Sequence, residues 1–132
     1  DFSSDGQRLL LSGRDDFIRV FDEPLRTFDQ FQTKCPHKNN TGIWICDFKP
    51  VFHPKYAEIV MTGNLDLKGI DVLYFAKYGQ GFATTKKHNI HDLKQVKGVH
   101  TFGQFHSRFE QCLFGVTYEK LVFYSKVPCD EF

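Results

Sequence analysis

A pattern that occurs three times constrains the fold of this chain more than any other feature. It begins at Phe2-Ser3-Ser4, returns at Phe52-His53-Pro54 and returns again at Phe105-His106-Ser107, at spacings of 50 and 53 residues. A glycine follows each start by ten or eleven residues, at Gly13, Gly63 and Gly115. An internal repeat of this length predicts a stacked or radial architecture, in which each unit covers its neighbours.

Short apolar segments flank each glycine and predict β-strands. The six expected strands are Leu9–Leu11, Ile18–Phe21, Ile59–Met61, Ile70–Leu73, Cys112–Phe114 and Leu121–Tyr124. They are rich in Val, Ile and Phe, and turn residues such as Ser4-Asp5-Gly6 separate them. A looser fourth strand is expected at Arg26–Phe31 and at Gly81–Thr85. The pattern therefore predicts an all-β protein built from the four-stranded units of a β-propeller.

The units resemble WD repeats. Phe2-Ser3-Ser4-Asp5-Gly6 is similar to the turn between the first two strands of a WD blade, and Phe21-Asp22 stands where that family usually has Trp-Asp. Because propellers need at least four blades to close, we expect about two and a half C-terminal blades of a larger ring of roughly seven. The expected divisions are 1–35, a partial blade without its innermost strand; 36–98, a complete blade preceded by an inserted loop; and 99–132, a final blade without its outer strand.

The composition is typical of a globular protein. Apolar residues make up 41% of the chain, including 15 phenylalanines, which is ample for a core. No apolar run approaches the roughly 18 residues of a membrane-spanning helix, so no membrane partner is expected. The four cysteines show no paired spacing, and we expect free, mostly buried thiols of an intracellular protein at Cys35, Cys46, Cys112 and Cys129.

The sequence contains no enzymatic motif. His-x-x-His at 88–91, and Cys35 with His37, lack the four-ligand spacing of a structural zinc site. We therefore expect no catalytic residue, no metal and no cofactor. His53 and His106 are interpreted as turn and inter-blade hydrogen-bonding residues.

Positive charge is concentrated in one part of the chain. The net charge is +1, yet the stretch 72–109 has a single acid, Asp92, against five lysines and Arg108. Two interpretations are open: a surface that meets phosphate, or a solvated outer strand with its connecting loop.

The most specific resemblance covers residues 37–73. His37-Lys38-Asn39-Asn40-Thr41-Gly42-Ile43-Trp44 and the segment 48–55 resemble a WD-repeat DNA damage-binding family, which comprises WD repeat-containing protein 76, its fungal counterparts and DNA damage-binding protein 2. Family members carry an Asn- and His-containing loop, a Thr-Gly-Arg-Trp element and a strand that ends in Trp-His-Pro. Met61–Asn64, Ile70–Val72 and Thr101–Ser107 continue the similarity.

The resemblance implies a non-enzymatic nuclear protein that binds double-stranded DNA or chromatin in the DNA-damage response. Protein partners are expected through other blades. In DNA damage-binding protein 2 a hairpin wedges into the duplex, and the matching positions here are Gly42, Ile43 and Trp44. Lys68 matches a basic position expected to contact phosphate, and charge and proximity add Lys38 and Lys49 as candidates.

Departures from the family keep alternatives open. Ile43 stands where the family has arginine, which removes one cation. Trp44, the only tryptophan, has three interpretations: a plug beneath its loop, a stacking or wedging residue in DNA, or a contact with a protein partner. The rival function is a generic WD-repeat interaction scaffold without DNA contact, including a substrate receptor of a ubiquitin ligase. The family's Trp-Asp-x-Arg box for ligase attachment is absent from Phe21–Pro24, Phe75–Lys77 and Tyr124–Lys126, so this segment does not support attachment.

Overall fold

The structure, a computed structural model, describes residues 1–22, 33–40, 42, 47–66, 68–78, 81–90, 99–100, 102–109, 112–117 and 120–125. For 76–78, 81–88 and 102 it describes the backbone alone. Within these ranges every regular element is a β-strand, in agreement with the predicted all-β class. The same ranges contain no helix of the length and apolarity that crossing a membrane would require.

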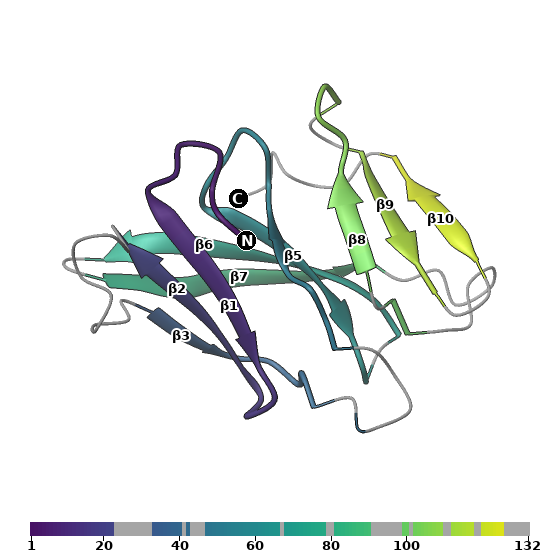
Figure 1. The fold of residues 1–132 in the computed structure, drawn as a ribbon, viewed down its shortest axis with the longest axis horizontal. Helices are drawn as coiled ribbons and strands as arrows, with labels where there is room; N and C mark the ends of the chain where they lie inside the picture. The colour runs from purple at the N-terminus through teal and green to yellow at the C-terminus, as the bar shows by residue number, and fades with distance from the viewer. Residues whose placement is uncertain are drawn as a thin grey trace.

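The strands of the described residues form three antiparallel sheets, each ordered as in the chain (Figure 1). The first sheet contains β1 (Arg8–Gly13), β2 (Phe17–Asp22) and β3 (Thr33–Pro36). The central sheet contains β4 (Val51–Phe52), β5 (Ile59–Asn64), β6 (Gly69–Tyr78) and β7 (Gly81–Ile90). The third sheet contains β8 (Phe102–Phe105), β9 (Leu113–Val116) and β10 (Leu121–Tyr124).

The predicted strands are confirmed except at their edges. All six flanking segments lie in β1, β2, β5, β6, β9 and β10, although β9 begins at Leu113 rather than at Cys112. Gly81–Thr85 is the first half of β7. Arg26–Phe31 lies outside the described residues, and the outer strand of the first sheet is β3. The division into blades at 1–35, 36–98 and 99–132 stays a prediction.

The three unit starts form similar turns, each closed by a backbone hydrogen bond, in agreement with the repeat. The backbone N–H groups of Ser3, His53 and His106 donate to the carbonyl groups of Arg8, Ile59 and Cys112, respectively, at 3.0, 2.8 and 2.8 Å. In addition, Nδ1 of each histidine accepts two backbone N–H groups of its turn, at 3.0 to 3.1 Å. These bonds confirm that His53 and His106 are turn residues.

The repeated glycines, by contrast, are not at equivalent positions of the three sheets. The first turn is one residue shorter than the other two, so alignment on the turn bonds pairs Gly63 with Ser12 and Gly115 with Thr62. A Cβ atom on Gly63, in the central sheet, would lie 1.8 Å from the carbonyl oxygen of His100, which precedes the third sheet. One on Gly115, in the third sheet, would point back to Ile70 of the central sheet, 2.7 Å away.

Successive residues of a strand point to opposite faces of its sheet, and both faces of the central sheet are buried. One core, against the first sheet, contains Val60, Leu73, Phe75 and Phe52 with Leu10, Ile18, Val20 and Cys35. The other core, against the third sheet, contains Ile59, Met61, Ile70 and Val72 with Phe105, Leu113 and Tyr124. The sheets therefore stack in chain order, which is consistent with part of a WD-like β-propeller.

Within the described residues, the far face of the third sheet is uncovered. The strand register places Leu121 and Phe123 at the positions of Ile70 and Val72 in the central sheet. Leu121 and Phe123 are 70% and 53% exposed, whereas Ile70 and Val72 are 1% and 0% exposed. The same repeat position is thus apolar in both sheets but buried in only one of them.

Candidate partner-binding surface

Most of the predicted site residues gather where two strand turns meet the segment 36–49. Asp16 lies in the β1–β2 turn, while Asp66 and Lys68 lie in the β5–β6 turn. Asp16, Lys38, Gly42, Lys49, Asp66 and Lys68 are all exposed, and we call these six residues the turn surface. Three of these residues lie in the two turns, and the other three lie in the segment between β3 and β4.

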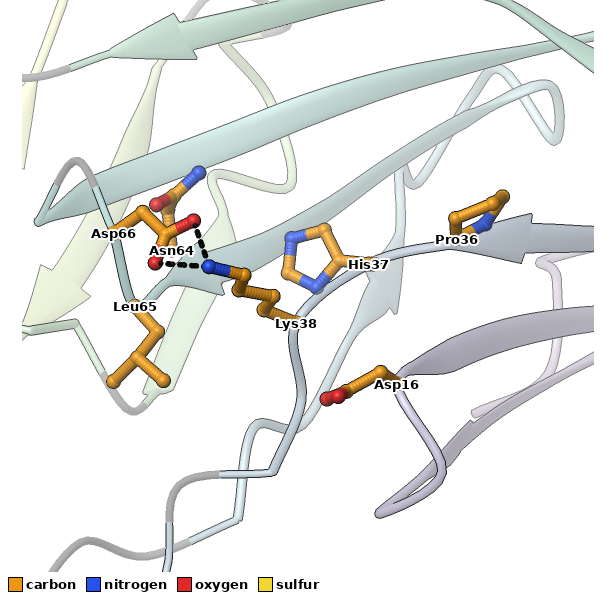
Figure 2. Close-up of a pocket in the computed structure, with 7 residues that line it drawn as sticks. All are labelled: Asp16, Pro36, His37, Lys38, Asn64, Leu65 and Asp66. Atoms are coloured by element: carbon orange, nitrogen blue, oxygen red, sulfur yellow. Dashed lines mark hydrogen bonds and ion pairs between the residues drawn. The ribbon is translucent and has the colours of Figure 1, made fainter.

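A pocket of about 260 Å³ opens between the two turns (Figure 2). Its lining consists of Asp16, Pro36, His37, Lys38, Asn64, Leu65 and Asp66. The Nζ atom of Lys38 lies 2.8 Å from Oδ2 of Asp66, and this hydrogen bond and the aspartate charge raise the pKa of the lysine. The ammonium group of Lys38 is therefore paired with a neighbouring carboxylate, in an exposed ion pair.

A buried polar network lies behind the pocket. Its centre is the carboxylate of Asp71, which is fully buried. One of its oxygens, Oδ2, lies 3.0 Å from Nε2 of His37 and accepts the side-chain amide of Asn64 at 2.8 Å, while Oδ1 accepts that of Asn89 at 2.7 Å. On its other side, His37 bonds through Nδ1 to Oδ1 of Asn39, at 2.7 Å. Burial of a carboxylate is tolerated here because several donors surround it.

The β1–β2 turn fixes the segment that carries His37. Asp16 has a left-handed backbone, with a φ of 61°, and its Oδ1 accepts the backbone N–H groups of Asn39 and Asn40, each at 2.9 Å. The amide nitrogen of the Asn39 side chain donates to the carbonyl oxygen of Phe17 at 2.9 Å. The start of the 36–49 segment is thus held to the first sheet from one side and to Asp71 of the central sheet from the other.

Among the predicted phosphate contacts, Lys49 and Lys68 differ from Lys38. Both are exposed, and no ion pair joins either of them to another described residue. Lys68 directly precedes β6, as predicted, and has a φ of 52°. Other cations near this end have partners, in the pairs Arg14–Asp47 and Arg19–Asp15. Of the lysines on the turn surface, Lys49 and Lys68 therefore have no ion-pair partner among the residues that the structure describes.

The structure describes only one of the three predicted wedge positions. Gly42 is exposed and has a φ of 73°, and no other described residue lies within 4 Å of a Cβ atom added to it. Ile43 and Trp44 lie outside the described residues. On either side of them, Asn40 bonds to Asp16 and Asp47 bonds to Arg14, so both flanks are tied to the same β1–β2 turn.

The remaining sequence candidates are placed apart from one another. Cys35 is buried in the core and Cys112 is partly buried; both are free thiols, as predicted, whereas Cys46 and Cys129 lie outside the described residues. His91 and the side chain of His88 are not described either. In the part of the chain that is described, no group of three or more His, Cys, Asp or Glu side chains could hold a metal ion.

Sequence reasoning missed the network around Asp71. A usable signal was present, because Asp71 interrupts an apolar strand between Ile70 and Val72. A carboxylate that shares a buried strand needs donors nearby. Its partners lie in the segment between β3 and β4, in β5 and in β7. Because they are on different elements, no local sequence pattern indicates them.

A comparison with curated proteins aligns 61 residues of this chain with WD repeat-containing protein 76 of Xenopus laevis, at 36% identity. The alignment covers 46% of this chain and 10% of that protein, so the chain spans about a tenth of this relative's length. No known protein family matches the chain in a family scan, and no solved structure matches it. The alignment and the antiparallel sheets together support a relation to WD-repeat proteins.

Proposed function

We propose that this chain is part of a non-enzymatic WD-repeat interaction module and that its turn surface binds duplex DNA. The observation that carries the proposal is the pair of exposed lysines, Lys49 and Lys68, that have no described acidic partner. Lysines of this kind bind phosphate and release counterions. The similarity of residues 37–73 to the damage-binding family supports DNA as the partner, with chromatin in the nucleus and the DNA-damage response as the setting.

The lysines of the turn surface differ in whether they form an ion pair. Lys38 pairs with Asp66, so we assign the main phosphate contacts to Lys49 and Lys68, which have no ion-pair partner among the described residues. Gly42 presents an open backbone between two anchored flanks, and Trp44 follows it by two residues. In the proposal, Trp44 stacks on bases while the lysines hold the backbone, since aromatic stacking and phosphate binding are the two usual components of such contacts.

Lysine substitutions with a matched control test the proposal. Binding of a fluorescent duplex is measured over a series of salt concentrations for the wild type, Lys49→Ala, Lys68→Ala and Lys55→Ala. We expect each of the first two to weaken binding and to reduce the salt slope by about 1. Lys55 is an exposed lysine in the β4–β5 turn, at the opposite end of β5, and its substitution should leave the slope unchanged. Equal effects of Lys68→Ala and Lys55→Ala would reject the turn surface as the DNA site.

A second candidate function, binding of a protein partner without DNA, is favoured by the pocket. The carboxylates of Asp16 and Asp66 line it, and they repel phosphate but suit polar groups of a protein. Asp66→Asn separates the two functions. For DNA, we expect tighter binding, because one negative charge is lost and Lys38 is released. For a protein partner that uses the pocket carboxylates, we expect weaker binding.

A further inference from the structure

Two cations at or near the turn surface use most of their donors on acidic partners. The Nζ atom of Lys38 contacts both carboxylate oxygens of Asp66, at 2.9 and 2.8 Å (Figure 2). Arg19 contacts the two carboxylate oxygens of Asp15 through Nη1 and Nη2, which form the fork of its guanidinium group. That fork is the part of an arginine that binds a phosphate in the bidentate geometry. Little of either donor set therefore remains for another anion.

Arg14 is paired differently. Its Nε atom donates to Oδ1 of Asp47 at 2.9 Å, and within the described part of the chain this is the one bond of its side chain. A guanidinium group has five N–H donors, so the four on Nη1 and Nη2 keep the geometry that binds two oxygens of a phosphate. The side chain of Arg14 is 61% exposed. The contact with Asp47 thus holds the group by its Nε atom and leaves the fork without a partner among the described residues.

Arg14 lies beside the segment that carries the DNA-binding candidates. It opens the β1–β2 turn, two residues before Asp16, which binds the start of the 36–49 segment. Its own partner, Asp47, precedes Lys49 by two residues. The Cα atoms of Asp47 and Lys49 therefore lie at most about 7.6 Å apart. This arrangement brings the guanidinium group of Arg14 near one of the two lysines assigned to phosphate.

We propose that Arg14 is a further phosphate contact of the DNA-binding surface, and that Asp47 orients it by holding its Nε atom. The inference rests on the proposed function and extends it to a residue outside the turn surface. In the proposed contact, Nη1 and Nη2 donate to two oxygens of one phosphate while Nε stays on Asp47. Arginine suits this contact because its planar fork matches phosphate, whereas the ammonium group of lysine acts as a point charge. Asp47 is thus a positioning residue, and Arg14 is the residue that touches DNA.

Substitutions of Arg14 with a matched control test the contact. Binding of a fluorescent duplex is measured over a series of salt concentrations for the wild type, Arg14→Ala, Arg14→Lys and Arg108→Ala. We expect Arg14→Ala to weaken binding about five- to tenfold at about 0.15 M salt and to lower the salt slope by about 1. Arg14→Lys should weaken binding but keep the slope, because the charge remains and the fork is lost.

Two controls accompany this series. Arg108 is an exposed arginine in the β8–β9 turn, which the repeat matches to the β4–β5 turn that carries Lys55. Its substitution should leave the slope unchanged. The thermal unfolding midpoint of Arg14→Ala should stay close to that of the wild type, because an exposed ion pair contributes little to stability. A loss of DNA binding in this variant is then a loss of contact rather than of fold.

A double-mutant cycle tests the role of Asp47. Asp47→Asn removes a negative charge near the phosphate in either background, which favours binding, but it removes the orienting contact only where Arg14 is present. We therefore expect Asp47→Asn to tighten DNA binding more in the Arg14→Ala protein than in the wild type. Equal changes in the two backgrounds would show that Asp47 does not orient Arg14.

The outcomes separate this inference from the proposed function. If Lys49→Ala and Lys68→Ala lower the salt slope but Arg14→Ala does not, Arg14 is not a phosphate contact and the proposed function stands. If Arg14→Lys lowers the slope as much as Arg14→Ala, the lost positive charge is not the cause and the contact is rejected. If the wild type shows no salt-dependent binding of duplex, the proposed function fails and this inference fails with it.

Discussion

Gly63 offers the sharpest test of how the central and third sheets are packed. A Cβ atom at this position would lie 1.8 Å from the carbonyl oxygen of His100 and 2.8 Å from two ring atoms of Phe48. Ordinary contacts begin at 3.4 Å, so the His100 backbone would have to retreat by about 1.6 Å. Because the obstacle is backbone rather than a flexible side chain, we expect Gly63→Ala to cost about 3 kcal/mol, the upper end for overpacking. Urea unfolding should show a lower midpoint with an unchanged slope.

Gly42 is the matched control, because its glycine requirement has a different cause. Its φ is 73°, and no atom of the other described residues lies within 4 Å of the added Cβ, so Gly42→Ala should cost about 1 kcal/mol from the left-handed backbone. Asparagine tolerates that backbone better than alanine does. We therefore expect Asn to be milder than Ala at Gly42 but more harmful than Ala at Gly63. A loss below about 1 kcal/mol for Gly63→Ala would refute the close approach.

Three further predictions use simple measurements. If Trp44 stacks in DNA, duplex should quench its fluorescence and protect it from acrylamide; a plug beneath the loop would already be protected without DNA. Hydrogen bonds from the Ser3 hydroxyl and then the Gln7 N–H lower the pKa of Asp5. That contribution is present above the ordinary value of about 4 and is lost as pH falls through the lower folded pKa, so thermal unfolding of wild type and Asp5→Asn should converge in acid. A thiol reagent should label Cys112, which is partly buried, before Cys35, which is buried.

The repeat was predictable because it depends on local residues. Each unit start combines an aromatic residue with a turn former, and apolar alternation marks the strands that follow. The equal spacing of Gly13 and Gly63 from their unit starts does not reflect equivalent positions, because the first turn is one residue shorter. A shift of one residue moves a side chain to the other face of its strand. The correct alignment of the three units therefore depends on the hydrogen bonds of the turns.

The candidate site was less predictable because its properties arise from pairing. The sequence alone does not distinguish Lys38 from Lys49 and Lys68, yet Lys38 pairs with Asp66, which lies in a turn 28 residues away. His37 lay within the resembling segment, but its partners are set by the register of β6 with β7 and by the Asp16 turn. Pairing depends on such long-range contacts, which no local pattern encodes.

Both described flanks of the 36–49 segment are anchored, which matters for the role proposed for Trp44. On the N-terminal side, Asp16 accepts two backbone N–H groups and the buried network holds His37. On the C-terminal side, Arg14 and Asp47 form an exposed ion pair, which contributes little to stability by itself. The adjacent Phe48 is 3% exposed, and its ring packs edge-on against that of His37, with 6.3 Å between the ring centroids. Both ends are therefore fixed to the same sheet before any partner arrives. In the proposed function, such fixed flanks would lower the entropy cost of binding through the positions between them, compared with a free loop.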